Sequence, residues 1–156
     1  MAEEEKSLSG RVNSFVTRKF GIPFTAQPKK AVQLPFNPTN MPPTKLQIVY
    51  TQMVAWQCFA AEQLASVKVD LLECDRELRI HKATLRHSRS SQKKWEVDSE
   101  IELDEQMQML EKRLMRLEAK AVVLGTLTTN YENKAKALSR ELSRRFSEID
   151  RSERSL

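Results

Sequence analysis

The residues able to do chemistry are few in this sequence, and their spacing does not build a catalytic centre. His81 falls on the expected apolar side of a helix, where a packed histidine is commoner than a ligand. Cys74 and His81 are about 10 Å apart along a helix, too far to bind one metal ion together. No CxxC, HExxH, GxSxG or glycine-rich phosphate loop is present. We therefore expect a protein that is not an enzyme and uses no metal or cofactor.

Basic residues are the more informative group. Between Arg76 and Lys94 the sequence has seven Lys or Arg and one carboxylate, Glu77. Near the C-terminus, cations recur every four residues, where like charges on a helix repel and an anionic partner would relieve the repulsion. The alternative is a solvated face on which Arg144 and Arg145 pair with nearby glutamates. The candidate nucleic-acid-binding residues are Arg79, Lys82, Arg86, Arg89, Lys93, Lys94, Lys136, Arg140, Arg144 and Arg145.

Composition limits the class of protein further. The 156 residues are 30% charged and 6% aromatic, with a formal net charge of +5, which permits an anionic partner without requiring one. No apolar run is long enough to span a membrane, and the first residues, Met-Ala-Glu-Glu-Glu, do not resemble a secretory signal. Two cysteines make no disulfide framework. We expect a reduced, cytoplasmic protein with no membrane partner.

The positions of proline and glycine predict long helices after residue 43. All six Pro precede residue 44, and only Gly125 interrupts the sequence from there onward. Thr44 and Gln47 match a capping box, which predicts a first helix over residues 44–88. Its apolar positions follow alternating steps of four and three, as in a coiled coil. This first seam comprises Leu46, Tyr50, Met53, Gln57, Ala60, Leu64, Val67, Leu71, Cys74, Leu78, His81 and Leu85.

A second helix is predicted over residues 98–150, after a polar turn at 89–97 and before a tail at 151–156. Ser99 and Glu102 form its capping box, and a second seam runs from Leu103 to Ile149. Two long helices joined by a short turn fold back on each other. The predicted fold is therefore all-α, a long antiparallel coiled-coil hairpin over residues 44–150. Gly125 marks a bend, and a full break there, giving three helices, is the alternative.

The N-terminal region is predicted to be non-helical. Residues 1–9 are polar and expected to be disordered, and the proline-rich residues 10–43 to form an extended arm. This arm either packs along its own hairpin or crosses to a neighbour. Apolar residues off the seam between Ile48 and Leu72 favour a homo-oligomer, because the arm alone must cover a long rod. The candidate partner or self-association residues are Phe15, Phe20, Phe24, Phe36, Val49, Trp56 and Phe59.

Two segments of the second helix, 117–124 (LEAKAVVL) and 131–145 (YENKAKALSRELSRR), follow a first helix that opens KLQIVY at residues 45–50 and carries Trp56. Together they resemble bacteriophage recombination mediators of the UvsY type, over about residues 44–146. The resemblance implies a small, basic, oligomeric helical hairpin that binds single-stranded DNA. It also implies partner proteins, a recombinase or a single-strand-binding protein, in the cytoplasm of a host cell. The proline- and phenylalanine-rich arm has no counterpart in that pattern.

Two functions follow as hypotheses. The first is a nucleic-acid-associated accessory protein, a phage-type recombination or replication mediator, whose affinity for single-stranded DNA falls steeply with salt. The second is a protein-only assembly or adaptor factor, such as a phage structural or scaffolding component or a factor docking on a host enzyme. Deleting residues 10–43 separates them, because an adaptor should lose its partner and a DNA binder should keep much of its affinity.

Overall fold

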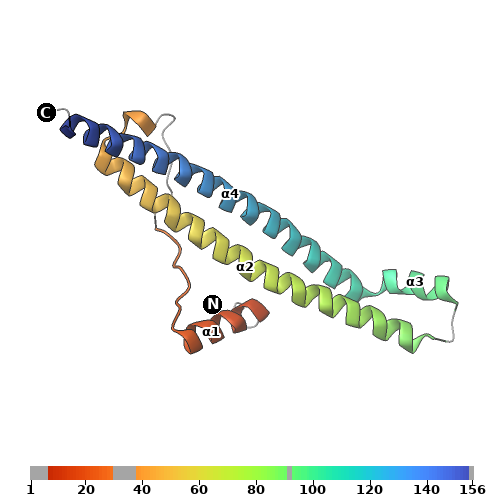
Figure 1. The fold of residues 1–156 in the computed structure, drawn as a ribbon. Helices are drawn as coiled ribbons and strands as arrows, with labels where there is room; N and C mark the ends of the chain where they lie inside the picture. Colours follow the sequence, from red (N-terminus) through yellow and green to blue (C-terminus); the bar gives the residue numbers. More distant parts are fainter. Residues whose placement is uncertain (1–6, 30–37, 91–92, 155–156) are drawn as a thin grey trace. The chain divides into compact units, whose positions relative to one another are not determined.

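The computed structural model describes residues 7–29, 38–90 and 93–154, and every regular element among them is a helix (Figure 1). In chain order the elements are α1 (Leu8–Phe20), the 3₁₀ turn η2 (Pro38–Asn40), α2 (Pro43–Ser88), α3 (Lys94–Leu103) and α4 (Glu105–Arg154). The described ranges contain no β-strand. The predicted all-α class is therefore confirmed.

The chain divides into two compact units, and α2 and α4 contribute to both. The first unit consists of Met1–Pro23 and Leu64–Val123, and the second of Phe24–Gln63 and Leu124–Leu156. Within each unit a segment of α2 packs against a segment of α4 (Figure 1). Pairing of the two long helices was the central expectation from their heptad patterns.

The core of the second unit lies between the first turns of α2 and the last turns of α4. Leu46 and Met53 of α2 are fully buried, as is Leu138 of α4. Met41, just before α2, accepts a hydrogen bond from Arg145, whereas Trp56 further along stacks on Tyr131. As the residue number rises along α2, the residue it contacts in α4 has a lower number, so the two helices are antiparallel in this unit.

The core of the first unit joins α3 to the two long helices. Val97 and Ile101 of α3 are buried with Met107 of α4. Leu78 and Leu85 of α2 pack against this cluster. α3 therefore covers the end of α2 with an apolar face of its own, although its ten residues would be marginal as an isolated helix.

The heptad seams agree closely with burial. Every seam position of α2 from Leu46 to Leu85 is buried or half-buried, and so is every seam position of α4 from Met107 to Arg145. The two ends of the second seam, Leu103 and Ile149, are exposed. Leu103 belongs to α3 and lies off its buried face of Val97 and Ile101, and Ile149 lies beyond the level at which α2 begins.

The predicted start of the second helix is wrong. Residues 94–97 were predicted to form a turn, but α3 begins at Lys94, and Ser99 lies inside it rather than at its cap. The backbone instead leaves the helix at Asp104, whose Oδ1 accepts the N–H of Met107 at 2.9 Å. Asp104 is thus the N-cap of α4, because an Asp side chain there satisfies a free N–H of the first turn.

Two other helix boundaries differ from the prediction, the end of α4 and the start of α2. α4 continues without a break through Gly125 and ends at Arg154, so most of the expected tail is helical. α2 begins at Pro43, one residue before the predicted cap Thr44. Proline suits a first helical position because it lacks the N–H that would have no partner there.

The prediction of an extended arm over residues 10–43 is also wrong in part, because residues 8–20 form α1. Ser7 caps this helix by accepting the N–H of Gly10 at 3.0 Å, so residues 7–9 are ordered structure rather than tail. At the other end Gly21 is left-handed, with φ 66°, and its N–H donates to Thr17. Residues 21–28 are non-helical, as expected. The predictions for residues 1–6 and 30–37, including Phe36, lie outside the described residues.

Candidate nucleic-acid and partner-binding surfaces

Six of the candidate cations gather where α2 ends and α3 begins, in the first unit. We call them the α2–α3 basic group. They are Arg79, Lys82, Arg86, Arg89, Lys93 and Lys94. Three are arginines paired with carboxylates: Arg79 with Asp75, Arg86 with Asp98 and Arg89 with Glu100. Lys82, Lys93 and Lys94 form no ion pair with any residue that the structure describes.

Two of these pairs tie α3 to the end of α2 and to Arg89, the residue after it. The Arg86–Asp98 and Arg89–Glu100 pairs each have a closest N–O distance of 3.0 Å. Arg89 Nη1 is buried, but no acceptor among the described residues meets it with hydrogen-bond geometry, Glu100 included. The guanidinium of Arg89 therefore keeps a donor that none of the described residues uses.

The junction between α3 and α4 carries a polar contact that the sequence did not reveal. His81 Nε2 lies 2.8 Å from the same Asp104 oxygen that caps α4. The hydrogen bonds from His81 and then from the Met107 N–H hold the pKa of Asp104 below its ordinary value. His81 thus sits on the seam, as predicted, and joins α2 to the first turn of α4.

The remaining candidate cations lie on α4 in the second unit, and we call them the α4 basic group. They are Lys136, Arg140, Arg144 and Arg145. Arg144 holds Glu141 with two hydrogen bonds of 2.8 and 2.9 Å and also pairs with Glu148. Arg145 bonds the same Glu141 at 2.7 Å. These contacts, Arg144 first, lower the pKa of Glu141 to about 2, and Glu141 in turn raises the pKa of Arg144.

Arg145 fastens the start of α2 to the end of α4. Its guanidinium donates to three backbone oxygens, those of Met41 at 2.6 Å, Thr39 at 2.7 Å and Pro38 at 3.2 Å. Only 16% of its side chain is exposed. Because η2 and the turn after it have few backbone hydrogen bonds of their own, the guanidinium of Arg145 supplies hydrogen-bond donors for their carbonyl oxygens. This role leaves little of Arg145 free for a ligand.

The candidate partner or self-association residues divide between the two units. In the second unit Val49 belongs to the core, and Trp56 and Phe59 are half-buried. Trp56 stacks on Tyr131 with ring centroids 6.1 Å apart and meets Phe59 edge-on. These side chains are therefore largely used within the unit, whereas Phe24 is exposed.

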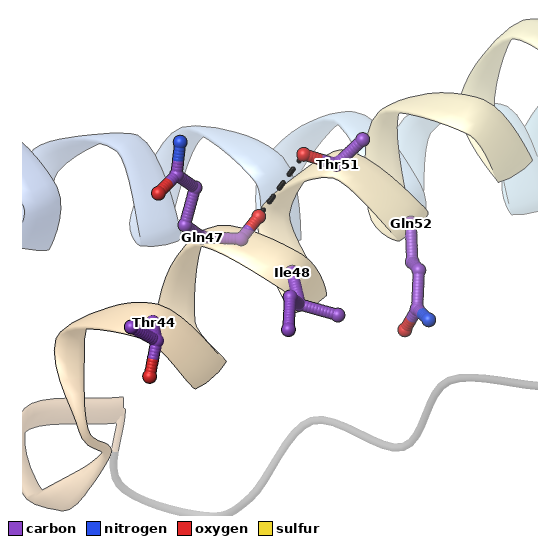
Figure 2. A pocket seen from close by; sticks show the side chains of 5 residues that line it. All are labelled: Thr44, Gln47, Ile48, Thr51 and Gln52. Atoms are coloured by element: carbon purple, nitrogen blue, oxygen red, sulfur yellow. Dashed lines mark hydrogen bonds between the residues drawn. The ribbon is translucent and has the colours of Figure 1, made fainter.

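A shallow hollow on the first turns of α2 is lined by Thr44, Gln47, Ile48, Thr51 and Gln52 (Figure 2). The Thr51 hydroxyl donates to the backbone oxygen of Gln47, one turn earlier on the same helix. The lining has no charged side chain and a single apolar one, Ile48. It thus offers neither the acids and bases of a catalytic site nor the apolar enclosure of a ligand pocket.

The candidates on α1 are arranged differently. Phe15 and Phe20 are exposed, and their rings meet edge-on at 6.3 Å. The ammonium of Lys19 lies over both rings, 5.3 Å from one centroid and 5.7 Å from the other. This small cationic and aromatic surface faces solvent in the first unit.

Metal-binding and membrane-spanning features are absent from the described ranges. They hold no group of three or more His, Cys, Asp or Glu able to bind a metal ion, and no helix there is both long and apolar enough to cross a membrane. Cys74 is buried, its thiol donates to the backbone oxygen of Leu110, and burial raises its pKa. A buried thiol of raised pKa is a poor nucleophile.

Comparison with protein-family models, with curated proteins and with solved structures finds no match to this chain.

Proposed function

We propose that this protein is a non-enzymatic, nucleic-acid-associated accessory protein that binds single-stranded DNA through the α2–α3 basic group. The similarity of residues 44–146 to phage recombination mediators supports the finer role. That role is a mediator that brings partner proteins onto single-stranded DNA in the cytoplasm of a host cell. The helical pairing of α2 with α4 supports a coiled-coil hairpin as its scaffold.

One observation carries the proposal: three lysines of the α2–α3 basic group have no carboxylate partner among the described residues. Lys93 and Lys94 are exposed and adjacent, and Lys82 lies on the neighbouring end of α2. Phosphate contacts by such residues supply most of the affinity of sequence-independent nucleic-acid binding.

The position of these lysines adds a second reason. Lys93 is the N-cap of α3 and makes no side-chain capping bond, and Lys94 is the first residue of the helix. The N-terminus of a helix is the positive end of its dipole, so cations there are unfavourable and an anion is favourable. A phosphate would offset both the dipole and the lysine charges.

The arginines beside them can also turn to a phosphate. Arg86 and its partner Asp98 are both exposed. Exposed ion pairs are worth about 0–1 kcal/mol, so exchanging a carboxylate for a phosphate costs little.

The test is a salt titration of oligonucleotide binding. Fluorescence anisotropy of a labelled single-stranded DNA should show affinity that falls steeply with salt. The triple variant Lys82→Gln, Lys93→Gln, Lys94→Gln should flatten the slope of log K against log salt by about 2, at roughly 0.7 for each phosphate that is no longer neutralised.

The matched control is Lys68→Gln, Lys112→Gln, Lys120→Gln. It removes the same charge from three other exposed lysines of the first unit that have no described ion-pair partner. Equal losses of affinity in the two triple variants would show a general charge effect and contradict a site at the α2–α3 junction. Absence of binding by the unaltered protein at low salt would remove the proposal altogether.

A second candidate function, protein-only assembly or docking on a host factor, is favoured by the exposed aromatic side chains of α1. Since α1 and the segment after it precede residue 30, deletion of residues 1–29 is a sharper test than deletion of 10–43. An adaptor would lose its protein partner on this deletion, whereas DNA binding through the α2–α3 basic group should persist.

A further inference from the structure

α1 is attached to α2 by polar groups. The N–H and hydroxyl of Ser9 donate to the two oxygens of Asp70 at 3.0 and 2.9 Å. Arg11 donates to Glu73 at 3.1 Å, and the Asn13 amide donates to Ser66 at 3.1 Å. Because carboxylates at a helix N-terminus also favour its dipole, Asp70 and Glu73 fix the start of α1.

Three of the apolar side chains of α1 remain exposed although the helix is attached. Val12 is 39% exposed, Phe15 46% and Phe20 61%. Lys19 lies among them with its ammonium over both phenyl rings. Val12, Phe15 and Lys19 fall three and four residues apart on one side of the helix. We call this surface, with Phe20, the outer face of α1.

The charge of this face identifies the chemistry of its partner. Residues 6–61 contain seven Lys or Arg and not one Asp or Glu. An ammonium in the middle of an apolar face is costly to bury against lipid chains or an uncharged surface. It is favourable against a surface that brings both apolar side chains and a carboxylate.

α3 presents such a surface on the side away from its core. Val97 and Ile101 point inward, while Trp95 is 68% exposed and Leu103 is 72% exposed. Glu102 is exposed beside them and has no ion-pair partner among the described residues. Residues 96–105 carry six carboxylates and no Lys or Arg. We call Trp95, Glu102 and Leu103 the outer face of α3.

The two faces do not meet within one copy. Leu8 of α1 bonds Glu73 of α2, and Asn13 bonds Ser66, so α1 runs antiparallel to α2. Phe15 and Phe20 therefore lie still further toward lower α2 numbers. α3 packs on Leu78 and Leu85, at least about 18 Å along α2 from Ser66.

We propose that the outer face of α1 binds the outer face of α3 of a second copy of this chain. Phe15 and Phe20 would pack against Trp95 and Leu103, and Lys19 would pair with Glu102. Each copy offers both faces, so the contact closes a dimer when it is reciprocal and builds a ring or filament when it is not. The argument for this contact does not use the proposed DNA binding, although Trp95 directly follows Lys94 of the α2–α3 basic group.

Sedimentation velocity of the full chain without nucleic acid tests the contact. The unaltered protein should associate with rising concentration. Lys19→Glu and Glu102→Lys should each weaken association by about tenfold, because each places like charges together. The double variant, Lys19→Glu with Glu102→Lys, should restore association to near the original value.

The restoration distinguishes this contact from a loss of folding, since two damaging changes would otherwise add. Lys112→Glu, an exposed charge reversal on α4, is the matched control and should leave association unchanged. A protein that stays monomeric at every concentration overturns the proposal, and so does a double variant as weak as the single ones. DNA binding, measured separately with the lysine variants, does not enter either outcome.

Discussion

The two basic groups have similar composition but differ in what holds their charges. In the α4 basic group, Lys136 pairs with Glu132, and Arg144 and Arg145 share Glu141. Only Arg140 has no ion pair with a described residue. In the α2–α3 basic group, three lysines have none. Three of the four cations of the α4 basic group thus pair with carboxylates, whereas half the cations of the α2–α3 basic group have no described partner.

The difference follows from where carboxylates lie along the helix. Residues 132–148 contain Glu132, Glu141 and Glu148, each three or four residues from a cation, the spacing at which side chains of a helix meet. Between Arg76 and Lys94 there is one carboxylate, and it faces Arg113 of α4 instead. A count of basic residues therefore predicts a binding surface poorly until their nearest acids are counted too.

The largest effect is expected from Arg145→Ala, which tests whether the α4 basic group stabilises the fold. It leaves three backbone oxygens without their charged donor and removes one of the two arginines that bind Glu141, so we expect a loss of about 2–3 kcal/mol in the free energy of unfolding. Urea unfolding measures this loss. Arg140→Ala is the control and should change stability by less than about 0.5 kcal/mol. Unchanged stability of Arg145→Ala would contradict a fastening role.

The next test compares the groups directly in oligonucleotide binding. Lys136→Gln, Arg140→Gln, Arg144→Gln should leave the dissociation constant for single-stranded DNA within about twofold. Lys82→Gln, Lys93→Gln, Lys94→Gln should raise it by about tenfold, because all three lysines have no carboxylate partner among the described residues, whereas Lys136 and Arg144 of the other variant are paired. Fluorescence anisotropy at one low salt concentration suffices. The opposite ranking would move the binding surface to α4.

Lowering the pH should reduce the stability that Glu141 contributes through the α4 basic group, and it should do so over a defined pH range. The pKa of Glu141 is lowered in the folded protein from 4.5 to about 2. Its contribution to stability is therefore complete above pH 4.5 and is lost as the pH falls toward 2. Thermal unfolding across this range should show a steeper decline for the unaltered protein than for Glu141→Gln. Parallel declines would mean that Glu141 is not held by Arg144 and Arg145.

The smallest effect is expected from Arg86→Gln. Both partners of the Arg86–Asp98 pair are exposed, so its loss should lower the free energy of unfolding by at most about 0.5 kcal/mol. Urea unfolding beside Arg145→Ala gives the contrast. A loss as large as that of Arg145→Ala would show that the pair does more than join exposed surfaces.

The long helices were predictable because burial follows their heptads almost residue by residue. Leu46, Met53 and Leu138, all on the predicted seams, are the largest apolar side chains that are fully buried. A repeat sustained over so many turns outweighs the ambiguity of any single position. Boundaries were harder to predict. Six carboxylates between residues 96 and 105 compete as helix caps or first-turn residues, and the sequence alone did not single out Asp104.

α1 was missed for another physical reason. Its attachment depends on Ser9 and Asn13, whereas helices are sought in sequence by a stripe of buried apolar residues. Signals were present, since Gly21 follows the helix and Arg18 and Lys19 fill its last turn. Likewise, the fork of Arg145 on residues 38–41 depends on a contact across more than a hundred positions. No local pattern reports such a contact.

The attachment of α1 has a consequence for the order in which the chain folds during synthesis. Its hydrogen bonds join Leu8 to Glu73 and Ser9 to Asp70, more than sixty residues apart. A helix of thirteen residues is marginal alone, so α1 has no lasting structure until those carboxylates have left the ribosome. α1, which is made before α2, is thus completed only after α2 exists. Until then its exposed phenylalanines are free to meet another nascent chain.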